Sequence, residues 1–203
     1  MKCILFIVFF MAGFLSVSAQ TYNEWIDKSF ECIESEDWTG AEKALIGALR
    51  VQPANPQNAL LLSNLGTIQR KMGKNDEALK SYTNALMITP RSVTLLMNRA
   101  ALFSEMEKFD DALKDYNQVL MLDDKEEDAL YLRGLIRLEK NDTTACRKDF
   151  EQLLKINPKS SNARIGLAAL MKLRGYYTEA IDLYTQVIRV NPEQTSLYLN
   201  RGE

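Results

Sequence analysis

Apolar residues recur along this chain in paired stretches, each with the spacing of one face of a helix. In residues 59–92, the first stripe is Leu61, Leu62, Leu65 and Ile68. The second stripe is Ala78, Leu79, Tyr82, Ala85 and Leu86. Such spacing is typical of amphipathic α-helices with one buried face. Gly73 lies between the stripes, where a left-handed helix cap is needed, and Gly175 occupies the same place in residues 161–194. The pattern therefore predicts two helices joined by a short turn.

The paired pattern returns with a period of 34 residues, and the same kinds of side chain return with it. The small-residue series is Gly66, Ala100, Gly134, Ala168 and Gly202. A second small series is Ala78, Ala112, Cys146 and Ala180, and an aromatic series is Tyr82, Tyr116, Phe150 and Tyr184. A fixed period of this length indicates stacked units that share a continuous core. The repeats are predicted at 22–55, 59–92, 93–126, 127–160 and 161–194.

Residues 195–203 restart the pattern as an incomplete sixth repeat. Tyr198, Leu199 and Gly202 match the start of the earlier repeats, and Gly202 would face no second helix. We expect either a short frayed helix or, in the favoured interpretation, the start of a further repeat in a longer array.

These positions are those at which one repeat family has preferred residues. In residues 59–92 the matching residues are Leu62, Leu65, Gly66, Ala78, Tyr82, Ala85 and Pro90, and Gln69 departs from the pattern. Over residues 22–194 the chain resembles the tetratricopeptide repeat (TPR) family. The resemblance implies an all-α protein, a right-handed α-solenoid of helix-turn-helix repeats.

A second departure concerns two charged residues that occur together. The seventh position of a repeat, usually apolar, is Arg99 in the third repeat and Arg133 in the fourth. The same two repeats carry Asp115 and Asp149 at the twenty-third position. We predict that Arg99–Asp115 and Arg133–Asp149 are partly buried ion pairs that join the two helices of each repeat. The alternative is a set of independent, solvated charges.

The N-terminus has the features of an export signal. Lys2 precedes an almost purely apolar run from Cys3 to Leu15, and Val17-Ser18-Ala19 fits a small-residue cleavage site. We expect residues 1–19 to be removed, which would leave Gln20 as the first residue. The alternative is an uncleaved anchor, although a spanning helix needs about 20 apolar residues. The expected location is outside the cytoplasm: the protein is predicted to be periplasmic or secreted, at a bacterial envelope, with no membrane span in the mature chain.

Composition narrows the chemistry. The chain has no histidine and a formal net charge of −2, and no basic stripe stands out. It therefore lacks the commonest general base and zinc ligand, and nucleic acid or an anionic membrane is a poor partner. Cys32 and Cys146 lie three repeats apart, too far for a disulfide, and are expected to be small buried thiols. We find no catalytic, metal-binding or cofactor-binding motif, so no enzyme activity, metal or cofactor is predicted.

The resemblance also implies a site, because TPR proteins typically bind peptide segments in a concave groove lined by the first helix of each repeat. Carried over by position, the candidate groove residues are Leu60, Asn64, Thr67, Met97, Asn98, Tyr131, Leu135 and Ile165. Asn64, Asn98 and Asn200 share one repeat position, and amide side chains can both donate to and accept from a peptide backbone. The basic clamp of the family's cytosolic chaperone-tail binders is missing, since only Asn98 of its expected residues is present.

The sequence thus predicts an exported, non-enzymatic scaffold that binds a protein or peptide segment of unknown identity. One alternative is an adaptor or sensor portion of a larger envelope protein. Another is a co-chaperone of a eukaryotic secretory pathway, for which the sequon Asn141-Asp142-Thr143 would be a glycosylation site. A stand-alone enzyme is the least favoured reading.

Overall fold

The computed structural model describes residues 20–202, all of whose regular structure is α-helical. The predicted leader, residues 1–19, lies outside the described residues. Five helices are the first of a pair: α1 (Tyr22–Glu34), α3 (Asn58–Lys71), α5 (Val93–Glu105), α7 (Glu127–Glu139) and α9 (Ser161–Leu173). Five follow as the second: α2 (Trp38–Val51), α4 (Asn75–Ile88), α6 (Phe109–Leu122), α8 (Thr143–Ile156) and α10 (Tyr177–Val190). The short helix α11 (Thr195–Gly202) begins the sixth unit.

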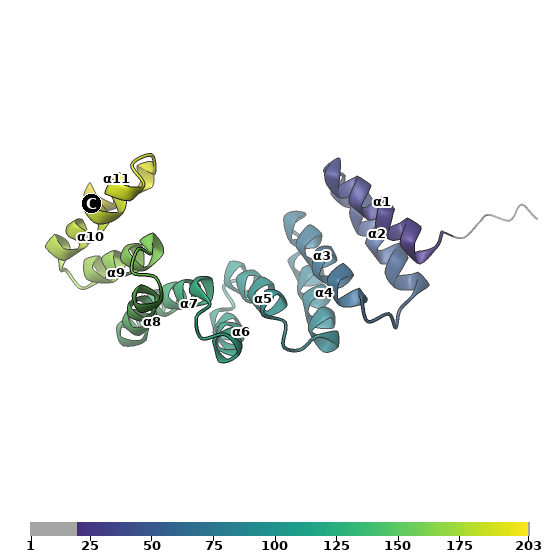
Figure 1. The fold of residues 1–203 in the computed structure, drawn as a ribbon, viewed down its shortest axis with the longest axis horizontal. Helices are drawn as coiled ribbons and strands as arrows, with labels where there is room; N and C mark the ends of the chain where they lie inside the picture. Colours follow the sequence, from purple (N-terminus) through teal and green to yellow (C-terminus); the bar gives the residue numbers. More distant parts are fainter. Residues whose placement is uncertain (1–19, 203) are drawn as a thin grey trace, which may run out of the picture.

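The helices form an α-solenoid, in which each pair packs on the next along a curved row (Figure 1). Second helices contact the first helix of the following pair throughout the described residues. First helices also contact one another, α3 with α5 and α7 with α9, and no two second helices have a comparable contact within residues 20–202. The first helices are therefore the more closely spaced set and line the inner side of the curve, as Figure 1 shows for α3, α5, α7 and α9.

Small residues in the first helices make room for the aromatic residues of the second helices. A Cβ atom added to Gly66 would lie 2.7 Å from the ring of Tyr82. Gly134 and Gly166 approach the ring of Phe150 from two successive repeats, and an added Cβ atom on either would lie 2.5 Å from it. Tyr82 and Phe150 are completely buried. The small–aromatic series thus fixes how closely the helices of one unit, and of adjoining units, can approach.

The turn between the two helices requires a left-handed residue in every repeat. Gly73 and Gly175 have φ values of 74° and 79°, as their position in the sequence predicted. The equivalent residues of the other three repeats are Glu36, Glu107 and Asn141, with φ values of 58°, 57° and 60°. A non-glycine residue is strained in this region, although asparagine tolerates it better than glutamate. The packing of the pair therefore imposes the turn even where the sequence does not favour it.

Two arginine–aspartate pairs join the helices of the third and fourth repeats. Arg99 donates two hydrogen bonds to Asp115, Nε to Oδ2 at 2.7 Å and Nη2 to Oδ1 at 2.8 Å. Arg133 contacts Asp149 in the same bidentate way, at 3.1 and 2.6 Å. Each arginine also reaches back to the preceding second helix, where it donates to a side-chain oxygen of Thr83 or Asn117. Each guanidinium group therefore links three helices from two repeats.

The structure adds a second set of polar contacts at the repeat position of Asp115 and Asp149. Asp149, whose side chain is only 3% exposed, also accepts a 2.6 Å bond from Arg137. In the second repeat, Ser81 occupies the position of Asp149 and donates to Gln69 Oε1 at 2.7 Å. Gln69 and Arg137 share the repeat position at which Gln69 departed from the apolar pattern. That departure is thus explained by a polar partner across the helix pair.

The two cysteines of the described chain are both free. Cys146 is fully buried, and its thiol donates to the Thr143 carbonyl oxygen at 3.3 Å. Cys32 is only partly buried, so the expectation of two buried thiols is wrong for this residue. It lies on α1, and a Cβ atom added to Gly40 of α2 would come within 2.8 Å of its Sγ atom.

Candidate functional site

The eight candidate groove residues all lie on first helices, and therefore on the elements that line the inner face. Leu60, Asn64 and Thr67 are on α3, Met97 and Asn98 on α5, Tyr131 and Leu135 on α7, and Ile165 on α9. Leu60 is the most open, with 65% of its surface exposed, and Thr67 is also exposed. The other six are half-buried.

Three of these residues also have internal roles. The Thr67 hydroxyl lies 3.0 Å from the Ser63 carbonyl oxygen and 3.0 Å from the Tyr82 hydroxyl. Met97 packs against the core of the second and third repeats. The ring of Tyr131 is tilted against Phe150, with 6.3 Å between ring centroids. Burial raises the pKa of the Tyr131 phenol above its ordinary value.

The two asparagines on α3 and α5 offer unused hydrogen-bonding groups. Asn64 and Asn98 are half-buried, and within residues 20–202 neither amide has a hydrogen-bond partner. An amide group that is partly exposed and unpaired can bond a peptide backbone as both donor and acceptor. The next members of this series are interrupted by Leu132 and Gly166, and Gly166 is required by the Phe150 ring that packs against it.

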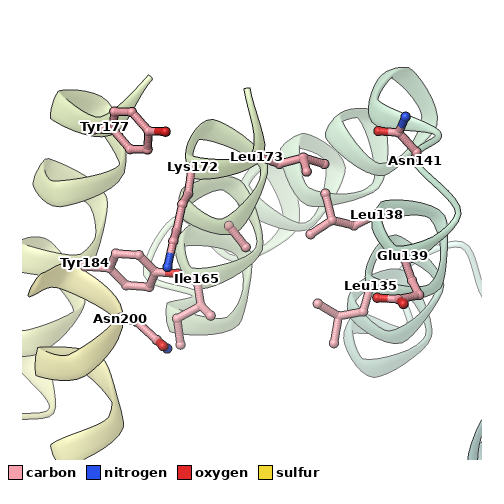
Figure 2. A pocket seen from close by; sticks show the side chains of 11 residues that line it. Leu135, Leu138, Glu139, Asn141, Ile165, Lys172, Leu173, Tyr177, Tyr184 and Asn200 are labelled. Atoms are coloured by element: carbon pink, nitrogen blue, oxygen red, sulfur yellow. The ribbon is translucent and has the colours of Figure 1, made fainter. Parts of the chain in front are cut away.

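A large hollow lies at the C-terminal end of the inner face. It has a volume of about 960 Å³ and is formed by α7, α9, α10 and α11 (Figure 2). Among the candidate groove residues, Leu135 and Ile165 line it from facing helices. The remaining six candidates do not belong to this pocket. The inner face thus has an open N-terminal part around α3 and α5 and a deeper C-terminal pocket.

The walls of the pocket are apolar with a few polar groups among them. Leu138 and Leu173 extend the surface begun by Leu135 and Ile165, and the tyrosine rings of Tyr177 and Tyr184 close one side, as Figure 2 shows. Burial raises the pKa of Tyr184 above its ordinary value, and the neighbouring Tyr131 adds to the effect. An apolar wall with a small number of polar groups is the usual composition of a ligand site.

Polar groups of the pocket come from the ends of helices. Glu139 is the last residue of α7, Asn141 follows in the turn, Lys172 lies near the end of α9, and Asn200 is on α11. Lys172 already interacts with another group of the chain. Elsewhere on the inner face, the facing charges of Arg70 and Glu105 are paired with each other.

Sequence reasoning missed most of the pocket because its candidate residues all lie before the last turn of the first helices. Leu138, Glu139, Lys172 and Leu173 lie one turn further toward the C-terminal end of their helices, and Tyr177 and Tyr184 belong to a second helix. The available signal was Leu173, an apolar residue outside the core stripe, which is 55% exposed in the structure. Exposed apolar residues that adjoin one another often mark a binding surface.

The described residues contain no converging group of three or more histidine, cysteine, aspartate or glutamate side chains that could hold a metal ion. Across residues 20–202, every helix is too short or too polar to cross a lipid bilayer.

Comparison with protein-family models finds the tetratricopeptide repeat twice in this chain. The matches cover residues 61–94 and residues 128–160. The second coincides closely with the predicted repeat 127–160, and the first with 59–92. No match is found among curated proteins.

Solved structures are similar over most of the chain. A tetratricopeptide repeat protein from Parabacteroides merdae ATCC 43184 is 42% identical, with a TM-score of 0.85, and the alignment covers 89% of this chain and 70% of that one. MamA from Desulfovibrio magneticus RS-1 is 16% identical, with a TM-score of 0.76 and coverage of 86% and 97%. YrrB, described as a TPR protein with an unusual peptide-binding site, is 12% identical, with a TM-score of 0.72 and coverage of 92% and 100%. The last two identities are low, so these likenesses concern the fold alone.

Proposed function

This chain belongs to the tetratricopeptide repeat family, whose members are generally non-enzymatic scaffolds for protein–protein interaction, and we propose that it acts as an exported scaffold that holds a protein or peptide segment in its inner groove. The proposed binding surface is that of the first helices from α3 to α9.

The observation that carries the proposal is the composition of this surface. It joins an exposed apolar residue, Leu60, to unpaired amides on α3 and α5 and then to the apolar pocket of α7 and α9. A segment lying along it could bond its backbone to Asn64 and Asn98 and place an apolar side chain against Leu135 and Ile165. The peptide-binding site named for YrrB, a protein of the same fold, supports a peptide as the class of partner.

Export is supported by the leader sequence, with its short positive start, apolar run and small-residue cleavage site in residues 1–19. In this proposal the array works after removal of the leader. The mass of the protein recovered from the envelope or medium tests this directly, because cleavage after Ala19 leaves Gln20 as the N-terminal residue. An intact N-terminus on the functional protein would contradict cleavage.

Site-specific photo-crosslinking tests the binding surface. A photoreactive phenylalanine analogue would replace Leu60 on the inner face or, as a matched control, Met121 on the outer helix α6. Both side chains are largely exposed, at 65% and 86%, so neither replacement disturbs the core. Irradiation in the producing cells should crosslink a discrete protein at Leu60 and not at Met121.

A second pair of variants links the crosslink to the groove. Ile165→Asp places a charge in the pocket and should remove the crosslink made from Leu60, whereas Met121→Asp should leave it intact. Equal crosslinking from both faces, or a crosslink indifferent to Ile165→Asp, would overturn the groove as the binding surface. Circular dichroism of each variant checks that the fold is retained.

A further inference from the structure

Among the described residues, the inner pocket is lined by one carboxylate, Glu139, which has no counter-ion within residues 20–202. Its equivalent in the preceding repeat is Glu105, which forms an ion pair with Arg70 of the repeat before it. The residue equivalent to Arg70, one repeat on, is Ser104, and its hydroxyl donates to the Ala100 carbonyl oxygen at 2.9 Å. One repeat further along the chain, the glutamate of this pair is present as Glu139, but serine replaces the arginine.

Neighbouring cations do not supply the missing charge. Lys140 pairs with Asp110 at 2.8 Å, and Arg137 pairs with Asp149. Within residues 20–202, Glu139 makes no ion pair. Lys172 lines the same pocket, but no ion pair joins it to Glu139. The carboxylate of Glu139 is consequently available to a cation brought by a partner.

The local backbone strengthens this preference. Glu139 is the last residue of α7, at the end where the helix dipole is negative, although the carbonyl groups of Ile136, Arg137 and Leu138 already accept from the backbone of the following turn. A cation at this end is favoured by the carboxylate and by the helix together. The apolar surface next to it, formed by Leu135, Leu138, Ile165 and Leu173, would contact an aliphatic or aromatic side chain (Figure 2).

We infer, on the basis of the proposed groove function, that the pocket between α7 and α9 selects a peptide segment in which an apolar side chain adjoins a lysine or arginine, with Glu139 as the counter-ion. The apolar side chain provides the buried contact area, and the cation provides selectivity against acidic segments. This preference is opposite in charge to that of a basic clamp for peptide carboxylates.

The direct test measures binding of short fluorescent peptides, capped at both ends, to the purified protein by anisotropy. The probes carry Leu-Lys-Leu, Leu-Gln-Leu or Leu-Glu-Leu within a Gly-Ser context. We expect the lysine peptide to bind about two- to fivefold more tightly than the glutamine peptide, and the glutamate peptide to bind more weakly still. The difference should shrink as ionic strength rises.

Three variants assign the preference to Glu139. Glu139→Lys should reverse the order of the lysine and glutamate peptides, and Glu77→Lys, an equal change of charge on the outer helix α4, should not. Ser104→Arg should also abolish the preference. The introduced arginine would pair with Glu139 as Arg70 pairs with Glu105, so that the Glu139 carboxylate would no longer be available to a peptide. Binding of the glutamine peptide serves as the check that each variant retains its pocket.

Equal binding of the lysine and glutamate peptides to the unmodified protein would overturn the inference, as would an order that Glu139→Lys leaves unchanged. Failure of all three peptides to bind would also overturn it. None of these results affects the crosslink from Leu60, so the proposed groove function stands or falls separately.

Discussion

The pair Arg99–Asp115 offers a quantitative test of how polar contacts hold the helices of a repeat together. We consider Asp115→Leu and Arg99→Leu, singly and combined. The double variant reproduces the fifth repeat, where Leu167 and Leu183 occupy these two positions. Leucine at both sites is therefore compatible with the geometry of the repeat.

The magnitude follows from burial and bonding. The Asp115 side chain is 5% exposed and accepts two charged hydrogen bonds, and the Arg99 side chain is 20% exposed. Breaking a buried pair by removing one partner costs about 3–5 kcal/mol, because the other charge is left uncompensated. Since Arg99 can regain some water and keeps its contact with Thr83, we expect each single change to cost about 2–4 kcal/mol.

The double variant should be far less affected. Replacing a whole buried pair by well-packed apolar residues is often close to neutral. We expect the free energy of unfolding to lie within about 1 kcal/mol of the unmodified protein, which gives a coupling energy of at least about 3 kcal/mol between the two sites.

Urea unfolding followed by far-ultraviolet circular dichroism measures these differences, provided that the slope with denaturant is unchanged. The control is Glu77→Leu, which replaces a single exposed charged residue by leucine and should alter the free energy of unfolding by less than about 0.5 kcal/mol. If the double variant loses as much stability as the sum of the two single variants, the residues act as independent charges and the reasoning fails.

Three further predictions concern backbone and packing. Glu107→Gly should raise the free energy of unfolding by about 0.5–1 kcal/mol, because glycine relieves a φ of 57°; a loss of stability in urea unfolding would contradict the strained turn. Gly134→Ala should lower the melting temperature, with a cost of about 1–3 kcal/mol from contact with the Phe150 ring, whereas Gly202→Ala, with no atom within 4 Å, should not. A thiol reagent should label Cys32 well before Cys146, because burial raises the pKa of the Cys146 thiol and encloses it; equal rates would show that Cys146 is accessible.

The sequence could assign much of the candidate site to one face of the first helices, but it could not show which of these residues form one pocket. The repeat position assigned Leu135 and Ile165 to facing surfaces of successive first helices, and these two residues do line one pocket. Repeat position alone gave no reason to distinguish them from Met97 or Thr67. Met97 packs against the core, and Thr67 shares a hydrogen bond with the buried Tyr82. Whether an inward residue is free for a partner depends on the curvature of the row and on neighbouring side chains.

Local sequence was sufficient to predict the features that recur within every helix pair. The period of 34 residues predicted the helix pairs and the all-α stack, because a small residue opposite an aromatic ring allows only one close approach, as at Gly66 and Tyr82. It also indicated which arginine would face which aspartate, since both residues lie in the same helix pair at a constant separation.

Contacts between repeats were decided only by the tertiary structure. The unpaired state of Glu139 depends on Ser104 one repeat earlier, and the pocket depends on four helices that converge from three units. Left-handed turns at Glu36 and Glu107 are likewise imposed by packing against local preference. Each of these results from how one helix pair is seated on the next, and that arrangement minimises the free energy of the whole stack rather than of any single segment.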